Sequence, residues 1–240
     1  MGFAQQIVIA AAADLSSVFP EVVTRFEKET GRKATVNFGS SGHFLQQIEN
    51  GAPFDLFFSA DMQYPQRLES EGLAEPGTFY RYATGRLVLY VPNGSPLDLS
   101  KGLHALQSPQ ARRIAIANPQ HAPYGRAAAE ALKKEGLYDA LQSRFVMGEN
   151  ISQTAQFVQS GAADAGLVAL SLALSPAMKA AGHYVEVPAS DHAPLEQAAV
   201  ILKSSHEKAT AALFLEFLRR PEIVTLLSQY GFTLPNAGRK

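Results

Sequence analysis

Four short segments combine serine, asparagine, proline or glycine at points where a strand-like run gives way to a helix-like run. They are AAADLSS (11–17), FGSSGH (38–43), NPQHAPYGRA (118–127) and GENISQTA (148–155). The first N–H groups of a helix have no partner inside it and lie at the positive end of its dipole, so a helix start can hold an oxyanion without a cationic side chain. Each segment alone could simply cap its helix. Four of them in one chain favour an anion-binding site.

The Gly-Ser-Ser-Gly turn at 39–42 admits three interpretations: a flexible join, a nucleophilic serine, or a cradle of backbone N–H groups. Its glycines permit close approach of the backbone, and Ser41 adds a hydroxyl donor. A nucleophile elbow requires G-x-S-x-G, whereas residues 39–43 read G-S-S-G-H. On a helix, His43 would point away from the turn. The cradle is therefore favoured over a hydrolase that uses Ser41.

Other chemistries find little support in the sequence. The chain has no cysteine, which excludes thiol catalysis, disulfides and thiolate metal sites. Its six histidines show no metal-binding spacing, and neither glycine-rich nucleotide motif occurs. Asp55 and Asp61 flank a predicted strand, where an end-of-strand hydrogen bond and a helix cap are favoured over catalysis. With a net charge of −1 and no basic run, nucleic acid is not an expected partner.

Strands and helices must alternate to position these segments. Apolar patterning predicts strands at 5–13, 33–38 and 54–60, each followed by a helix, at 14–31, 42–51 and 63–73. Further strands are predicted within 112–119, 144–148 and 164–170, and helices at 124–141, 152–162, 207–220 and 221–231. Such alternation is typical of an α/β fold with mostly parallel sheets flanked by helices.

Two long extended stretches, near 80–90 and 194–202, interrupt this alternation. We interpret them as two extended crossover strands that join two lobes, with 1–83 and 198–240 in lobe 1 and 84–197 in lobe 2. Open α/β sheets bind ligands at the carboxyl ends of their strands. Two facing lobes would therefore bind a ligand in the cleft between them.

Two motifs together resemble a known family. S-S-G-x-x-x-x-Q-I-E-N-G-A-P-x-D-x-F-x-S-A-D at 40–61 and P-x-x-x-P-Y-G-R-A at 119–127 are similar to the periplasmic molybdate-binding proteins of ABC transporters. That family has the two-lobed class II periplasmic binding protein fold. The similarity extends over nearly the whole chain, to GENISQTAQFVQSGAADAGLV (148–168) and LSQYGFTLP (227–235).

The resemblance implies which residues contact the ligand. Carried over position by position, they are Ala13, Asp14, Ser41, Tyr124 and Ile151. Many relatives have serine, threonine or asparagine where this chain has Asp14, so the role of its side chain is in question. Because a carboxylate aimed at a dianion would repel it, we expect the Asp14 side chain to turn back and cap the N–H of Ser16 or Ser17. The alternative is that the carboxylate coordinates the metal centre of the oxyanion itself.

The resemblance further implies an extracytoplasmic solute-binding protein, not an enzyme, that captures molybdate or tungstate and delivers it to the transmembrane subunits of an ABC permease. It would act as a monomer without a cofactor, and would bind the oxyanion through its oxygens with no direct contact to the metal. A receptor for another oxyanion or a small carboxylate is the alternative. For a carboxylate, Arg126 is the one candidate at a junction, and it lies past the helix start.

We expect a periplasmic or other extracytoplasmic location. The segment MGFAQQIVIAAAADL at 1–15 lacks a basic start, so the expected signal peptide is absent from this sequence. No apolar stretch approaches the roughly 18 to 20 residues of a membrane helix.

Overall fold

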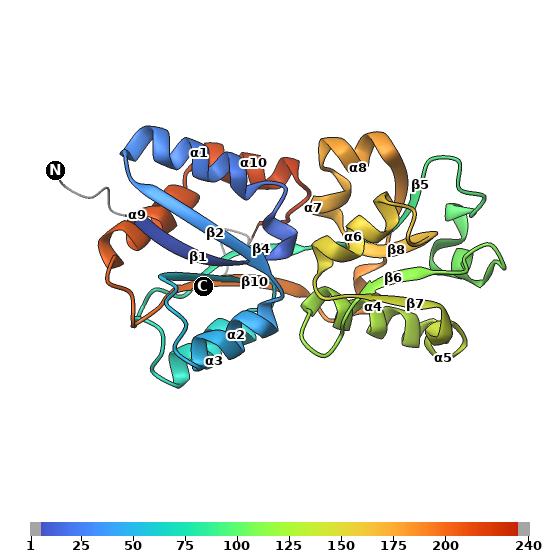
Figure 1. The fold of residues 1–240 in the computed structure, drawn as a ribbon, viewed down its shortest axis with the longest axis horizontal. Helices are drawn as coiled ribbons and strands as arrows, with labels where there is room; N and C mark the ends of the chain where they lie inside the picture. Colours follow the sequence, from blue (N-terminus) through green and yellow to red (C-terminus); the bar gives the residue numbers. More distant parts are fainter. Residues whose placement is uncertain (1–5, 235–240) are drawn as a thin grey trace. The chain divides into compact units, whose positions relative to one another are not determined.

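The computed structural model describes residues 6–234, which form two compact α/β units (Figure 1). The chain passes from unit 1 to unit 2 at Thr84–Gly85 and returns at Leu195–Glu196. Unit 1 is therefore built from two separate parts of the sequence, and unit 2 is the continuous segment Gly85–Leu195. Among the residues described, no helix is long and apolar enough to cross a membrane.

The sheet of unit 1 has five strands in the order β2-β1-β3-β10-β4. Their bounds are β1 (Gln6–Ala12), β2 (Lys33–Gly39), β3 (Leu56–Ser59), β4 (Tyr80–Gly85) and β10 (Leu195–Ile201). β1 pairs in parallel with both β2 and β3, whereas β10 runs antiparallel to β3. The sheet is thus mixed, because the strand that returns the chain from unit 2 runs against its neighbour.

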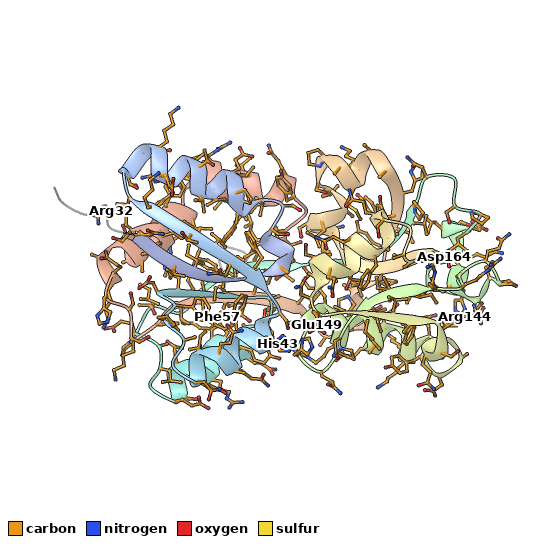
Figure 2. All side chains as sticks on the ribbon, in the orientation of Figure 1. Arg32, His43, Phe57, Arg144, Glu149 and Asp164 are labelled. Carbon is orange, nitrogen blue, oxygen red and sulfur yellow. The ribbon has the colours of Figure 1, made fainter. Side chains whose placement is uncertain are left out.

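Helices cover both faces of this sheet, with α1 and α10 along one face and α2 and α3 along the other (Figure 1). The bounds of the unit 1 helices are α1 (Phe19–Thr30), α2 (Ser41–Glu49), α3 (Gln63–Ser70), α9 (Lys208–Leu218) and α10 (Pro221–Gln229). Successive side chains of a strand point to opposite faces. Leu56 and Phe58 of β3 accordingly pack with α1, α9 and α10, whereas Phe57, labelled in Figure 2, packs with α2 and α3.

Aromatic rings form the centre of the larger core of unit 1. The Phe58 ring makes edge contacts with Phe19, Tyr82 and Phe214, with centroids 5.1, 5.5 and 6.0 Å away. Such edge-to-face pairs add to the free energy gained from burying the rings. Because Phe214 lies on α9, this cluster joins the early and late parts of the sequence.

Unit 2 repeats the plan with a five-stranded sheet in the order β7-β6-β8-β5-β9. The strands are β5 (Leu87–Pro92), β6 (Ile114–Ala117), β7 (Phe145–Gly148), β8 (Ala165–Ala169) and β9 (Gly182–Glu186). β6 pairs in parallel with β7 and β8, and β5 runs antiparallel to β8 and β9.

The helices of unit 2 are α4 (Pro123–Lys134), α5 (Tyr138–Leu141), α6 (Ile151–Gln159), α7 (Leu170–Ala173) and α8 (Pro176–Ala181). Short 3-10 segments are η2 (Leu99–Gln107), η3 (Gln142–Arg144) and η4 (Ala189–Asp191). α4 and α6 lie on opposite faces of the sheet (Figure 1).

The predicted alternation of strands and helices is confirmed, with two corrections to the helices. The helix predicted at 14–31 begins only at Phe19, because a 3-10 turn, η1 (Ala13–Leu15), follows β1 directly. The helix predicted at 124–141 divides into α4 and α5 at Gly136, whose φ of 69° is left-handed. β9, α7, α8 and the 3-10 segments were not predicted from the sequence.

Phe58→Ala should destabilise unit 1 strongly, because it removes a fully buried ring that three others contact. Large-to-small aromatic substitutions in cores cost about 3 to 5 kcal/mol. The measurement is the free energy of unfolding of unit 1, from urea titrations followed by circular dichroism. Phe38→Ala is the matched control, since Phe38 is 36% exposed, and should cost under about 1 kcal/mol. Equal losses in the two variants would contradict this description of the core.

Candidate functional site

The start of α2 is the predicted Gly-Ser-Ser-Gly turn of unit 1. Ser40 is extended, with φ −74° and ψ 133°, and its side chain makes no cap hydrogen bond to the helix. Ser41 begins the helix and is buried, and its Oγ accepts a hydrogen bond of 3.0 Å from the N–H of Ala60. That bond occupies an acceptor site of the hydroxyl and leaves the O–H hydrogen to be donated elsewhere. The turn therefore presents backbone donors and one hydroxyl donor.

Gly39 is required for the geometry of this turn. A Cβ atom at Gly39 would lie 2.9 Å from two atoms of the Phe44 ring. Phe44 is itself buried against α3 and β3, so the ring cannot easily move. The glycine thus lets β2 run directly into α2 with the helix start held close to the sheet.

Asp14 is not at the start of an α-helix, contrary to prediction. It lies in the 3-10 turn η1, whose three residues are all buried. Helix α1 begins later, at Phe19, and no side chain caps its start. At Ser16 a backbone carbonyl takes the place of the predicted side-chain cap. The N–H of Ser16 donates to the carbonyl of Ala13 at 3.2 Å, and Oδ2 of Asp14 accepts from Nε2 of Gln197 at 2.5 Å. The Asp14 side chain is thus held from β10.

The start of α4 in unit 2 agrees with its prediction. Pro123 occupies the first helical position, which suits a residue without an N–H, and Tyr124 follows it, buried. The preceding Ala122 makes no side-chain cap. A Cβ atom at Gly125 would lie 2.2 Å from the carbonyl oxygen of Ala117, so only glycine lets the first turn of α4 pack against the end of β6.

The start of α6 is capped as predicted by Asn150. Its side chain accepts hydrogen bonds of 3.0 Å from the N–H groups of both Ser152 and Gln153. Ile151, at the first helical position, is buried, and its N–H lies outside this cap. Sequence similarity had implicated Ile151, and the cap satisfies the two N–H groups that follow it.

Strand pairing brings the predicted residues together within each unit. In unit 1, Ala12 at the end of β1 is paired with Gly39 at the end of β2, so η1 and α2 begin at the same edge of the sheet. In unit 2, Ala117 at the end of β6 is paired with Gly148 at the end of β7, so the segments leading to α4 and α6 leave from one edge. Ala13, Asp14 and Ser41 thus form one set, and Tyr124 and Ile151 form the other.

Neutral donors dominate the buried polar groups. Among the described residues, the buried polar side chains include serines, threonines, Gln197 and two aspartates, but no lysine or arginine. Asp14 is the one buried charge in unit 1 among these residues, at 0% exposure. An anion held here would depend on helix starts and hydroxyls, as the composition predicted.

Of the remaining carboxylates singled out from the sequence, Asp55 makes the predicted end-of-strand hydrogen bonds, whereas the N-cap position of α3 is Met62 and not Asp61. Oδ2 of Asp55 accepts from the N–H of Val8 at 2.8 Å, and its Oδ1 accepts from the hydroxyl of Ser205 at 2.6 Å. Oδ1 of Asp61 accepts from the N–H of Gln63 at 2.9 Å, next to the start of α3. Sequence reasoning missed Gln197, whose only signal is a polar residue inside the apolar run of β10.

Comparison with known proteins gives consistent matches along almost the whole chain. Residues 7–233 match the family described as bacterial extracellular solute-binding protein. The molybdate-binding protein ModA of Rhodobacter capsulatus is 38% identical, over 95% of this chain and 88% of that protein. ModA of Azotobacter vinelandii is 36% identical, over 96% and 91%. The solved structure of the periplasmic molybdate-binding protein of Azotobacter vinelandii has a TM-score of 0.89 and 37% identity, covering 96% of this chain and all of that one. The predicted fold class is thereby confirmed.

Asn150→Ala should destabilise unit 2, because two N–H groups at the start of α6 lose their acceptor. Loss of an N-cap costs about 1 kcal/mol, within a range of roughly 0.5 to 2. Asn150→Asp is the matched control, since it keeps an oxygen acceptor and adds a charge that the helix dipole favours. Urea unfolding should show a loss for the alanine variant only. An alanine variant as stable as the aspartate variant would contradict the cap.

Proposed function

The chain belongs to the bacterial extracellular solute-binding proteins, and from its similarity to the molybdate-binding members we propose that it binds molybdate and delivers it to the permease of an ABC transporter. Tungstate, a dianion of the same shape, would bind as well. No reaction is proposed, because binding and release are sufficient for this role. We propose that the protein acts as a monomer outside the cytoplasm.

One observation supports the proposal beyond similarity: the positions implicated lie at or next to the starts of helices or of a 3-10 turn in each unit, and the buried polar side chains of the described residues include no lysine or arginine. Molybdate has four oxygen acceptors and two negative charges. Helix-start N–H groups and a serine hydroxyl satisfy such oxygens, with the helix dipoles favouring the charge. We propose that the ligand is held by backbone groups at Ala13, Asp14, Tyr124 and Ile151 and by Ser41. The metal would be contacted only through its oxygens.

A site of this kind would select among tetrahedral anions in two ways. Sulfate has the same acceptors and charge but shorter bonds to oxygen, so the size of the site would disfavour it. Phosphate carries a proton near neutral pH, and a set composed of donors would leave that O–H without an acceptor, which costs binding free energy. Tungstate differs too little from molybdate in size for either effect.

Isothermal titration calorimetry with four anions tests the proposal. We expect molybdate and tungstate to bind at one site per chain, with sulfate and phosphate at least about 100-fold weaker. At 100 times the dissociation constant, bound ligand should add about 2.7 kcal/mol to stability, visible as a raised melting temperature. The proposed function would be contradicted if sulfate gave the same heat of binding and the same rise in melting temperature as molybdate. It would also be contradicted if neither molybdate nor tungstate gave a heat of binding or a rise in melting temperature.

Ser41→Ala should weaken molybdate binding about 10- to 100-fold, because a hydrogen bond to a charged ligand contributes about 1.5 to 3 kcal/mol. The variant also removes the acceptor for the N–H of Ala60, so circular dichroism must show that unit 1 remains folded. Ser70→Ala, at the exposed end of α3, is the matched control and should bind like the wild type. Identical titrations for all three proteins would remove Ser41 from the site.

A further inference from the structure

Three buried side chains of unit 1 form a chain of hydrogen bonds that ends at Asp14. The hydroxyl of Tyr82 on β4 lies 2.7 Å from Oε1 of Gln197 on β10. Nε2 of Gln197 lies 2.5 Å from Oδ2 of Asp14 in η1. Asp14 and Gln197 are 0% exposed and Tyr82 is 1% exposed. None of the ligand contacts implied by similarity explains why Tyr82 or Gln197 should be polar.

The chain of hydrogen bonds has a fixed direction. Burial raises the pKa of Tyr82 well above its usual value, and the nearby charge of Asp14 raises it further, so the hydroxyl stays protonated and donates. Its nearer acceptor is Gln197 Oε1, since the carbonyl of Ser59 is 3.4 Å away. With its oxygen turned to Tyr82, the Gln197 amide must direct its NH₂ group to Asp14. Tyr82 thus sets the amide orientation that Asp14 requires.

Both strands that connect the units contribute to this chain of hydrogen bonds. Tyr82 lies two residues before Thr84, where β4 leaves unit 1, and Gln197 lies directly after Glu196, where β10 returns. Thr84 is in turn fixed by two backbone hydrogen bonds to Thr233, of 2.7 and 3.0 Å. A change in backbone torsion at either crossing would therefore alter the hydrogen bonds to Asp14.

We propose that Gln197 and Tyr82 are positioning residues of the oxyanion site, which hold the Asp14 carboxylate with a donated N–H and link it to the two crossing strands. This rests on the proposed function. A carboxylate that moved freely beside a dianion would repel it. The Gln197 donor fixes the carboxylate, and with it the backbone of η1, and its dipole offsets part of the negative charge.

The elements that carry this chain of hydrogen bonds also carry charged groups. On the strands themselves, Arg81 of β4 forms an exposed ion pair with Glu196 of β10. After β3, Asp61 accepts from the N–H of Gln63. Asp14 is the only titratable side chain of η1. A second carboxylate introduced at position 197 would replace the amide that donates to Asp14, so the two carboxylates would face each other directly.

Gln197→Glu tests the proposal through the pH dependence of molybdate affinity. Two carboxylates so close share one proton at low pH, so that the pair then carries a single negative charge. As pH rises and the shared proton leaves, the second charge repels the dianion. The ratio of the variant's dissociation constant to that of the wild type should rise from near one to at least about tenfold between pH 5.5 and 8.5, at constant ionic strength.

Gln66→Glu is the matched control, because it makes the same change on the exposed side of α3 and should follow the wild-type pH profile.

Tyr82→Phe is the second variant, which needs no buried charge. Without the phenol donor, the Gln197 amide is no longer held in the orientation that Asp14 requires, and affinity should fall about three- to tenfold with no new pH dependence.

The outcomes separate this inference from the proposed function. The positioning role is supported if the ratio of dissociation constants rises with pH for Gln197→Glu and stays flat for Gln66→Glu. Weaker molybdate binding by a folded Tyr82→Phe also supports it. Wild-type affinity in Tyr82→Phe together with a flat ratio for Gln197→Glu overturns the positioning role and leaves molybdate binding standing. If Gln197→Glu does not fold, the affinity of Tyr82→Phe decides. A wild-type protein that binds no molybdate overturns both proposals.

Discussion

In each unit, two adjacent parallel strands end at paired residues, and this pairing determines where the proposed ligand-binding segments lie. Ala12 is level with Gly39 in one sheet and Ala117 with Gly148 in the other, and each pair is followed by segments that lead to a helix or 3-10 turn. A shift of one residue in either register would turn the strand's apolar side chains to the wrong face. The burial that stabilises each unit therefore also fixes which backbone N–H groups lie side by side.

Close packing then limits how these donors can be arranged. Gly39 and Gly125 stand where a Cβ atom would collide with the Phe44 ring or with the Ala117 carbonyl, so the first turns of α2 and α4 are fixed close to the sheets. Donors that are rigid before a ligand arrives lose little conformational freedom on binding. In this view the rigidity of the helix starts compensates for the absence of buried lysine or arginine among the described residues. Asp14, held by Gln197, is the exception that this arrangement has to accommodate.

The sequence predicted those parts of the structure that local pattern determines. Alternating apolar runs located β1, β2 and β3, and capping residues located the starts of α4 and α6. The sequence did not predict hydrogen bonds between distant segments, nor the position at which α1 begins. η1 was taken for a helix start because aspartate is common at such positions, whereas Pro20 in the first turn of α1 marks the true start. Gln197, which donates to Asp14, lies 183 residues away, and no local pattern can identify it.

The α/β class was predicted correctly, but both sheets are mixed where mostly parallel sheets were predicted. Strands and helices that alternate along a chain predict parallel neighbours. β10, which follows unit 2 in the sequence, pairs antiparallel with β3. β5, the first strand of unit 2, likewise pairs antiparallel with β8. The extended stretches were recognised as crossings, but the direction in which each would pair depends on where the chain re-enters the sheet. That information is distributed over the whole fold.

The two crossings also have a consequence for the order in which the molecule can be completed during synthesis. Unit 2 is continuous and is finished once Leu195 has been made, whereas unit 1 then still lacks β10 and both of its last helices. Until then Phe19 and Phe26 have no Phe214 to pack against, and β3 presents an unpaired edge. The nascent chain thus carries a finished second half and an unfinished first half with exposed rings, a state prone to self-association. The segment from Glu196 onward includes none of the proposed ligand contacts, yet its addition completes unit 1 and so commits the chain to its native state.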